Sequence, residues 1–403
     1  MSGKPPRVVL GVAGGIAAYK ACELLRLFTE SGHRVRVVPT AAALRFVGAP
    51  TWAALSGQPV ADEVWADVHE VPHVRLGREA DLVVVAPATA DLLARAAHGL
   101  ADDLLTSTLL TARCPVVYAP AMHTEMWEHP ATVDNVATLR RRGAVVIEPA
   151  VGRLTGADTG KGRLPEPEEI FAVARRVLAR GTAADSDLSG RRVVVTAGGT
   201  REPLDPVRFL GNRSSGKQGY AFARTAVARG ARVTVVAANV TLPDPAGADV
   251  VRVTTTEELR TATLAAATDA DVVVMAAAPA DFRPARYAAE KIKKTADGRV
   301  APLDLVTNPD IAAELGARKR PDQLLIAFAA ETHDALAHAK EKLLRKRADL
   351  IVVNEVGDDR AFGTDTNAAT VLGADGSTTE ISNRPKEDLA DAVWDLVVAR
   401  LCG

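Results

Sequence analysis

The stretch RRVVVTAGGTREPLDPVRFLGNRSSGKQG at residues 191–219 decides how the second half of this 403-residue chain folds. Its valine run at 193–195 is β-branched and flanked by charged residues and glycine, which predicts a buried parallel strand. Two glycine-bearing clusters, AGGT at 197–200 and SSGKQG at 214–219, come before an apolar run at 220–227. Glycines let a backbone approach a ligand closely, and a helix N-terminus offers free N–H groups. The stretch therefore predicts an anion site.

The segment GNRSSGK at 211–217 has the glycine and lysine spacing of a P-loop, but we reject that interpretation. Gln218 stands where a P-loop has the Ser or Thr that binds magnesium, and residues 205–208 separate the glycines from the strand. A glycine-rich turn without a ligand is the alternative. The two clusters have more polar side chains around them than a turn needs. These residues are Arg201, Arg208, Asn212 and Lys217.

The motif GGTREPLDPVRF at 198–209, followed by NRSSGKQG at 212–219, resembles the signature of the phosphopantothenate-cysteine ligase domain of coenzyme A biosynthesis. The resemblance implies a two-step reaction. The carboxylate of phosphopantothenate attacks the α-phosphorus of CTP with Mg²⁺, and the amine of cysteine then displaces CMP from the acyl cytidylate. It also implies that Asn212 and Arg208 handle this intermediate, where an amide binds oxygens whose charge shifts. Lys217 is expected to be a phosphate ligand.

Downstream, a strand expected at 271–276 runs into a loop that ends in Ala-Asp-Phe, and EKIKK follows at 290–294. Four charged residues around Ile292 suit triphosphate oxygens, although a solvated loop is the alternative. The resemblance implies that Asp281 reads the cytosine ring and that Lys291 stabilises charge on the phosphates.

The segment 308–311 is expected to cap a helix whose N–H groups face nucleotide phosphates. Lys342 and Lys346 are four residues apart on one helix face, for which a solvated face is the alternative. With these residues, the resemblance implies a CTP site made of Met275, Ala276, Ala277, Asp281, Lys291, Asn308, Pro309, Asp310, Ile311, Ala312, Phe328, Lys342 and Lys346.

The first half opens with an expected strand at 7–12, a glycine turn, a helix at 16–30 and a strand at 35–38. This order predicts a phosphate at the helix N-terminus. NAD is excluded because the turn lacks the third glycine of GxGxxG and the second strand ends at Thr40 without a carboxylate for the ribose. FMN has one phosphate and no second ribose, so it requires neither the third glycine nor the carboxylate. Thr40 then bonds the phosphate or ribityl chain, or else caps residues 41–46.

Two more expected strands, at 81–86 and 116–119, lead into PATAD at 87–91 and PAMH at 120–123. Both loops lie at carboxyl ends of strands, where open α/β sheets bind ligands. His73 begins a short helix in HVRLGREAD. Together these motifs resemble the homo-oligomeric flavin-containing cysteine decarboxylases, in particular phosphopantothenoylcysteine decarboxylase, over most of residues 5–180.

The decarboxylase resemblance implies a reaction in which FMN oxidises the cysteine moiety to a thioaldehyde. Carbon dioxide then leaves, and the reduced flavin returns the electrons. His73 is the implied base. The implied FMN residues are Gly14, Gly15, Ile16, Ala17, Thr40, Ala88, Thr89 and Ala90.

The chain departs from this family at two positions. The family has Asn where this chain has His123, and a Cys in the glycine-rich flap where this chain has Thr155. Imidazole can bind the substrate carboxylate in place of the amide. A threonine hydroxyl is a far weaker acid than a thiol with a pKa near ~8.5, so the last proton comes from another donor, such as His123 or a flap water, or the route varies. The flap at 151–164 predicts a lid over the substrate, and a disordered connector is the alternative.

The composition is that of an ordinary globular protein, with 47% hydrophobic and 25% charged residues. A net charge of −1 gives no broad basic field, so we expect no nucleic-acid partner. No apolar run approaches a membrane span or a signal segment, and three widely spaced cysteines exclude a disulfide framework and a CxxC metal site. We expect a cytoplasmic protein without a membrane association, and metal ligands are not assigned.

The fold class expected is α/β, with two Rossmann-like doubly wound parallel-sheet domains. The first, residues 1–181, is a flavodoxin-like flavoprotein decarboxylase domain, residues 182–190 are a linker, and residues 191–403 are the ligase domain. The leading hypothesis is a bifunctional enzyme that takes phosphopantothenate, cysteine and CTP as substrates. By analogy with the families it is a homo-oligomer, a dodecamer of trimers linked by ligase dimers. The alternatives are a ligase with an impaired decarboxylase half, an NAD(P)H-dependent flavin oxidoreductase, and a nucleotide-binding regulatory or scaffold protein.

Overall fold

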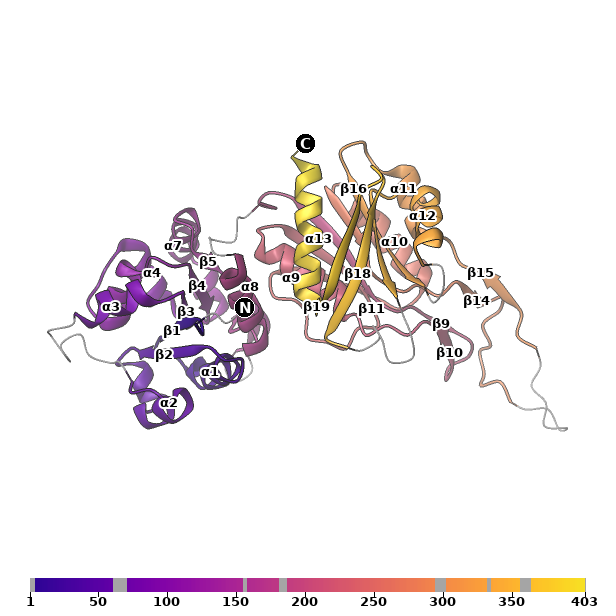
Figure 1. The fold of residues 1–403 in the computed structure, drawn as a ribbon. Coiled ribbons are helices and arrows are strands. Elements are labelled where there is room, and N and C mark those ends of the chain that lie inside the picture. The colour runs from indigo at the N-terminus through magenta and orange to yellow at the C-terminus, as the bar shows by residue number, and fades with distance from the viewer. Residues whose placement is uncertain are drawn as a thin grey trace. The chain divides into compact units, whose positions relative to one another are not determined.

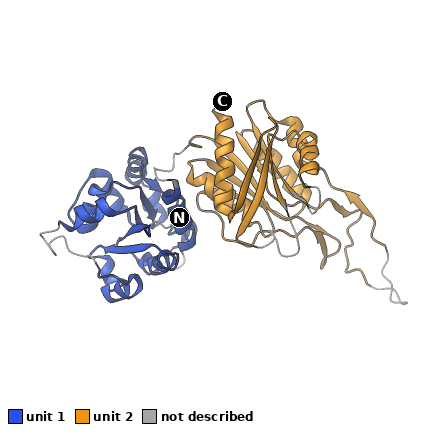
Figure 2. Ribbon diagram, viewed as in Figure 1, with its two compact units in different colours: residues 1–185 blue, residues 186–403 orange. Residues whose placement is uncertain are grey.

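The structure is a computed structural model, and it describes residues 4–60, 71–154, 158–180, 187–293, 302–331, 335–355 and 364–402. The chain folds into two compact units, residues 1–185 and 186–403 (Figure 2). Each unit is built on a sheet with helices on both faces (Figure 1). The expected α/β class with two doubly wound sheets is confirmed.

The sheet of the first unit has five parallel strands in the order β2-β1-β3-β4-β5. This is the flavodoxin-like order, as expected. β3 is buried along its whole length because its sequence, LVVVAPA, presents apolar residues to both faces. The strands are β1 (Arg7–Val12), β2 (Arg34–Pro39), β3 (Leu82–Ala88), β4 (Val116–Pro120) and β5 (Val145–Val146).

Two hydrophobic clusters, one on each face, hold this sheet between its helices. Val8 and Leu10 of β1 belong to the cluster that contains Phe28, Trp52 and residues of α8. Val9, which lies between them, belongs to the cluster under α4, α5 and α7. The helical elements are η1 (Ile16–Tyr19), α1 (Lys20–Glu30), η2 (Ala43–Arg45), α2 (Ala49–Ser56), α3 (Pro72–Glu79), α4 (Ala90–His98), α5 (Leu104–Thr111), α6 (Thr124–Glu128), α7 (Pro130–Arg141) and α8 (Pro167–Arg180).

The sheet of the second unit has eight strands in the order β12-β11-β8-β13-β16-β17-β18-β19. The first six are parallel, and β18 and β19 add an antiparallel hairpin at the edge. The sheet is therefore mixed rather than wholly parallel. Its strands are β8 (Arg192–Gly198), β11 (Arg232–Ala238), β12 (Ala248–Val253), β13 (Val272–Met275), β16 (Leu324–Glu331), β17 (Leu350–Glu355), β18 (Thr366–Gly373) and β19 (Thr378–Pro385).

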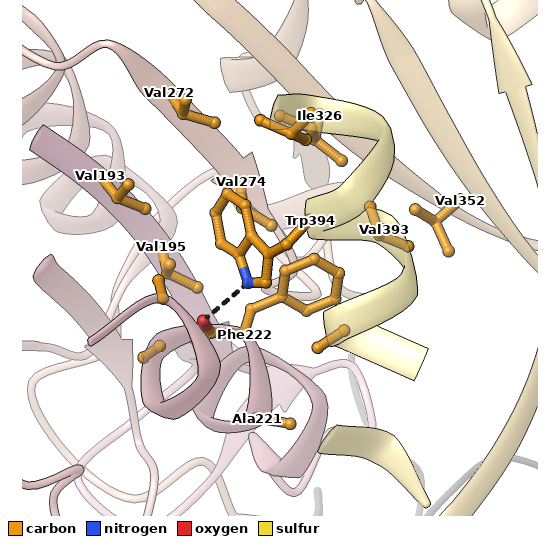
Figure 3. Packing of buried hydrophobic residues seen from close by; sticks show 14 of the residues in the cluster. Val193, Val195, Ala221, Phe222, Val272, Val274, Ile326, Val352, Val393 and Trp394 are labelled. Carbon is orange, nitrogen blue, oxygen red and sulfur yellow. Dashed lines mark hydrogen bonds between the residues drawn. The ribbon is translucent and has the colours of Figure 1, made fainter. Parts of the chain in front are cut away.

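Helices α9 (Lys217–Ala228) and α13 (Lys386–Leu401) cover one face of this sheet, and α10 (Thr256–Ala267), α11 (Ile311–Arg318) and α12 (Ala335–Arg345) cover the other. Trp394 lies at the centre of the first face, edge-on to Phe222, with 5.6 Å between ring centroids (Figure 3). Its indole N–H donates to Thr225 Oγ1 at 2.9 Å, so the buried polar atom has a partner.

Among the described residues, three short antiparallel strand pairs lie outside the main sheets, and their strands were not expected from the sequence. They are β6 (Ala150–Arg153) with β7 (Thr159–Arg163), β9 (Arg201–Pro203) with β10 (Phe209–Gly211), and β14 (Phe282–Pro284) with β15 (Leu305–Thr307). The first of them is formed by the predicted flap.

The second unit begins before the end of the expected linker. Leu188 is fully buried in its core, and the Asp187 carboxylate accepts from Arg229, whose side chain is 1% exposed. Residues 187–190 therefore pack with the second unit. Every helix that the structure describes is too short or too polar to cross a bilayer.

Candidate active sites

The predicted flavin-binding residues of the first unit come together at the carboxyl edge of its sheet. A Cβ atom on Gly14 would lie 2.3 Å from the Cβ of Ala42, and one on Gly15 would contact Thr89 at 3.7 Å. Backbone bonds join the same loops, since the Thr40 N–H donates to Val12 O at 2.9 Å and the Ala13 N–H donates to Pro87 O at 3.1 Å. The turn after β1 therefore contacts the loops after β2 and β3.

The turn after β1 fits a bound phosphate. Gly14 leaves no room for a side chain, and no side chain caps the helical turn that starts at Ile16, whose own side chain is 65% exposed. Uncapped N–H groups at a helical N-terminus are suited to an anion. Thr40 is 7% exposed, and its Oγ1 accepts from Ala43 N–H at 3.2 Å, as the capping alternative predicted. The Thr40 hydroxyl can still donate to a ligand.

The flap hairpin is docked on the loop that follows β4. The Met122 N–H donates to Gly162 O at 2.9 Å. A Cβ on Gly162 would lie 2.2 Å from Met122 O, and one on Gly160 would lie 2.2 Å from Thr124 Oγ1. Because neither position admits a side chain without displacement, the glycines of β7 are what lets the strand lie on this loop.

Two partly exposed carboxylates, those of Glu148 and Glu166, anchor β7 at its sides. Glu148 accepts from Arg140 at 2.7 Å and from Lys161 at 2.8 Å. Burial alone would raise the pKa of Glu148, but these two cations hold the pKa below its ordinary value. Glu166 accepts from Lys20 of α1 at 2.9 Å and also from Arg163. The second pair ties the end of the flap to the helix that follows the glycine turn.

The three predicted catalytic residues of the first unit have different outcomes. His123 lies on the loop that the flap contacts, with its Nδ1 atom 3.9 Å from Asp158 Oδ2. Thr155 lies outside the described residues, so its role stays a prediction. His73 lies on α3, as expected, and its carbonyl accepts from Thr111 of α5 at 2.7 Å. No bond among the described residues joins His73 to the glycine turn, and its buried Nδ1 has no hydrogen-bond partner among them.

In the second unit, Asp205 holds two predicted catalytic segments together. Its carboxylate accepts from the N–H groups of Val207, Arg208 and Ile292, at 2.8, 2.8 and 3.1 Å. The Arg208 guanidinium donates to the same carboxylate at 2.6 Å and to Ile292 O at 2.6 Å. Burial opposes ionisation of Asp205, yet these donors hold its pKa well below the usual range. Arg208 is thereby fixed beside the loop that carries Lys291.

The loop after β13 is fixed by side-chain bonds to its backbone. Asn212 donates to Pro279 O at 2.8 Å, and the Ala277 N–H donates to Thr196 Oγ1 at 3.1 Å. Asn308 donates from Nδ2 to Ala280 O at 2.8 Å, and its Oδ1 accepts from Arg283 at 2.8 Å. The predicted residues on both sides of this loop are thus in contact, and the Asn308 side chain is already occupied by protein partners.

Several predicted nucleotide-binding residues of this unit are paired with other protein groups. Lys346 donates to Asp310 at 2.9 Å, and Asp310 caps α11 by accepting from Ala313 N–H. Lys217 donates to Asp365 at 2.7 Å, and Phe328 packs edge-on against Phe222 with 5.5 Å between centroids. The structure brings Lys346 to the helix start at Asp310, but it places Phe328 on the α9 side of the sheet. No group of three His, Cys, Asp or Glu side chains among the described residues is arranged to hold a metal.

Sequence reasoning missed the supporting carboxylates Glu148, Glu166, Glu202 and Asp205, of which the last two are buried. A pattern of single charged residues beside Pro and Gly is typical of exposed turns, and it gave no signal for burial. The one signal available for Asp205 was its place inside the motif GGTREPLDPVRF at 198–209.

The folds and loops define a class of two-unit α/β protein, with a mononucleotide-type glycine turn in one unit and a second doubly wound unit after it. Two family models match the chain: "Flavoprotein" over residues 2–178 and "DNA/pantothenate metabolism flavoprotein C-terminal domain" over residues 188–401.

Relatives match the chain over its whole length. The coenzyme A biosynthesis bifunctional protein CoaBC of Mycolicibacterium smegmatis is 60% identical over 98% of each chain. The protein of the same name from Mycobacterium tuberculosis strain H37Rv is 59% identical over 99% of this chain and 98% of the relative. A solved structure of a CoaBC C-terminal domain is 35% identical, with a TM-score of 0.46, and covers 54% of this chain and 98% of that chain. The chain belongs to the family of bifunctional coenzyme A biosynthesis proteins.

Proposed function

We propose that the chain is a bifunctional enzyme that makes phosphopantothenoylcysteine in its second unit and decarboxylates it in its first. The observation that carries the proposal is the 59–60% identity to bifunctional coenzyme A biosynthesis proteins, which spans both units. Because the product of one unit is the substrate of the other, the two activities belong on one chain.

In the second unit, phosphopantothenate is activated by CTP with Mg²⁺, and cysteine then displaces CMP. Asn212 and Arg208 are assigned to the acyl cytidylate, and Lys291 and Asp281 to the phosphates and the cytosine ring. In support, Asp205 places Arg208 next to the Lys291 loop, and Asn212 is bonded to Pro279 two residues before Asp281. The Asp310–Lys346 pair at the start of α11 supports a phosphate site there.

In the first unit, the residues proposed to hold FMN are those around Gly14, Gly15, Thr40 and Thr89, whose loops are in contact. When bound, FMN supplies reversible two-electron chemistry at the cysteine moiety. His73 accepts the proton at Nδ1 or Nε2, and His123 binds the substrate carboxylate. The docked flap excludes water from the reaction.

We further propose a homo-oligomer of trimers and ligase dimers, working in the cytoplasm. The short hairpins of the second unit expose large apolar side chains, which is typical of surfaces buried by another chain; they are Val207, Phe209, Phe282, Tyr287, Leu305 and Val306. Analytical ultracentrifugation of the whole chain tests the expected twelve copies, and a monomer contradicts it.

One assay tests the proposed function. Purified protein is incubated with phosphopantothenate, cysteine, CTP and Mg²⁺, and CMP and carbon dioxide are measured. We expect CMP only when phosphopantothenate is present, and carbon dioxide only from chains that also bind FMN. CMP without carbon dioxide supports a ligase with an impaired decarboxylase, and oxidation of NADH by the flavin under anaerobic conditions supports the oxidoreductase alternative.

A further inference from the structure

Glu202 of β9 is a buried carboxylate without a cation. It is 3% exposed, and no Lys or Arg among the described residues pairs with it. Its Oε1 atom accepts from the backbone N–H of Thr256 at 2.9 Å and from the Thr256 hydroxyl at 2.7 Å. The Thr256 N–H lies at the start of α10, so the helix N-terminus stabilises the negative charge. Burying a carboxylate without a cation costs free energy, so the buried position of Glu202 requires an explanation.

From Glu202, a chain of hydrogen bonds leads to the predicted nucleotide loops. The Thr256 hydroxyl lies 2.9 Å from the Thr200 hydroxyl, and Thr200 Oγ1 accepts from the Ala280 N–H at 2.8 Å. Asn308 Nδ2 donates to Thr256 Oγ1 at 3.3 Å and to Ala280 O at 2.8 Å. Thr200 and Thr256 are both fully buried, so water does not compete for these bonds.

The carboxylate fixes the direction of every bond in this chain. An ionised carboxylate only accepts, so Thr256 must donate its proton to Glu202. Thr256 Oγ1 then accepts from Thr200 and Asn308, and Thr200 in turn accepts from the backbone of Ala280. In a pair of hydroxyls without a carboxylate at one end, either hydroxyl can be the donor. Glu202 therefore selects a single arrangement of the loops at 278–281 and 308.

We propose that Glu202, acting through Thr256, is a positioning residue for nucleotide binding in the second unit. It holds Ala280 and Asn308 so that the following residue, Asp281, whose carbonyl accepts from the Asn308 N–H at 2.9 Å, keeps a fixed backbone position. This inference rests on the proposed CTP-dependent ligase function, and it adds a residue that contacts neither nucleotide nor substrate.

The test is Thr256→Val, which removes the hydroxyl and keeps the shape of the side chain. The matched control is Thr255→Val at the neighbouring position, which removes the N-cap of the same helix but has no bond to the nucleotide loops. We expect Thr256→Val to raise KM for CTP roughly tenfold, as for one lost bond in a charge-assisted network, with KM for cysteine unchanged. Thr255→Val should lower Tm by roughly 2–4 °C and leave KM for CTP as it is.

Thr256→Ser keeps the hydroxyl and should restore KM for CTP. If Thr256→Val does not fold, Glu202→Gln replaces it, because the amide keeps the shape while its NH₂ group no longer enforces one bond direction. Equal effects at Thr255 and Thr256, or a folded Thr256→Val protein with normal KM for CTP, overturn the inference.

Calorimetric titration with CTP alone separates this inference from the proposed function. A wild-type chain that binds CTP but forms no CMP contradicts the ligase activity, while the ratio of CTP dissociation constants between Thr256→Val and wild type still tests the positioning role. A wild-type chain that binds no CTP overturns both.

Discussion

Gly162→Ala is the substitution expected to separate the two activities most cleanly. The new Cβ would lie 2.2 Å from Met122 O, more than 1 Å inside the ordinary contact of about 3.3–3.6 Å between carbon and a carbonyl oxygen. The obstacle is backbone, so it cannot rotate away. The flap strand must move off the loop after β4 and lose the bond from Met122 N–H.

The magnitude follows from two costs. Overpacking of this kind costs about 1–3 kcal/mol, and leaving the Met122 N–H without its acceptor costs about 1–3 kcal/mol more, which together give roughly 2–6 kcal/mol. For closure of the flap, this free energy corresponds to a decrease of roughly 30- to 25,000-fold in the ratio of closed to open flap. We expect decarboxylation to fall by a comparable factor, because the closed flap excludes water from the substrate.

The assay measures carbon dioxide and CMP from the same chain. Only carbon dioxide should fall, since Gly162 lies in the first unit and CMP formation reports on the second. Gly160→Ala should have a smaller effect, because its Cβ meets the Thr124 side chain, which can rotate. Gly48→Ala is the control without a clash, with Pro50 Cδ at 3.5 Å. If Gly162→Ala decarboxylates at the wild-type rate, the docked hairpin is not the working state of the flap.

Three further perturbations test other parts of the structure. His73→Asn should reduce carbon dioxide release by about 10²- to 10⁴-fold, as for loss of a general base, with CMP formation unchanged, and equal loss of both would contradict the assignment. Arg229→Met removes a buried guanidinium that pairs with Asp187, Asp391 and Asp395 and should cost about 3–5 kcal/mol, seen as a fall of roughly 10 °C in the Tm of the second unit; an unchanged Tm would show that the cluster is not a net stabiliser. The pKa of Glu148 is lowered on folding, so its stabilisation is present above its ordinary value of 4.5 and is lost as pH falls through the folded value; Glu148→Gln should flatten the acid dependence of the first unit's Tm, and an unaltered pH profile would refute this.

Much of the fold could be predicted from the sequence because its strands are long and apolar on both faces. The runs at β3 and β8 are buried by their composition alone, and glycines mark the turns at the ends of β1 and β8. The short hairpins could not be predicted in this way. β14 and β15 have three residues each and are mostly exposed, so their pairing depends on tertiary contacts that no local pattern records.

The sequence predicts candidate ligand-binding loops because these loops follow strands. It predicts less well which side chains in the loops bond to other protein groups. Thr40 was expected either to bind the flavin or to cap the next segment, and its Oγ1 does accept a backbone N–H. Asn308 was expected in the nucleotide site, yet its amide is used up by Ala280, Thr256 and Arg283. Residue type and position indicate which loops form the candidate site, but whether a side chain contacts a ligand or supports its loop depends on bonds between distant segments.

The supporting role falls repeatedly to carboxylates that join two segments, and there is a physical reason for this. An ionised carboxylate accepts several bonds and donates none, so donors from separate segments can converge on it without competing. Asp205 joins the β9–β10 hairpin to the Lys291 loop, and Glu166 joins β7 to α1. Replacement by the amide keeps the volume but adds a donor where only acceptors fit, so Asp205→Asn should leave the fold intact and still slow CMP formation.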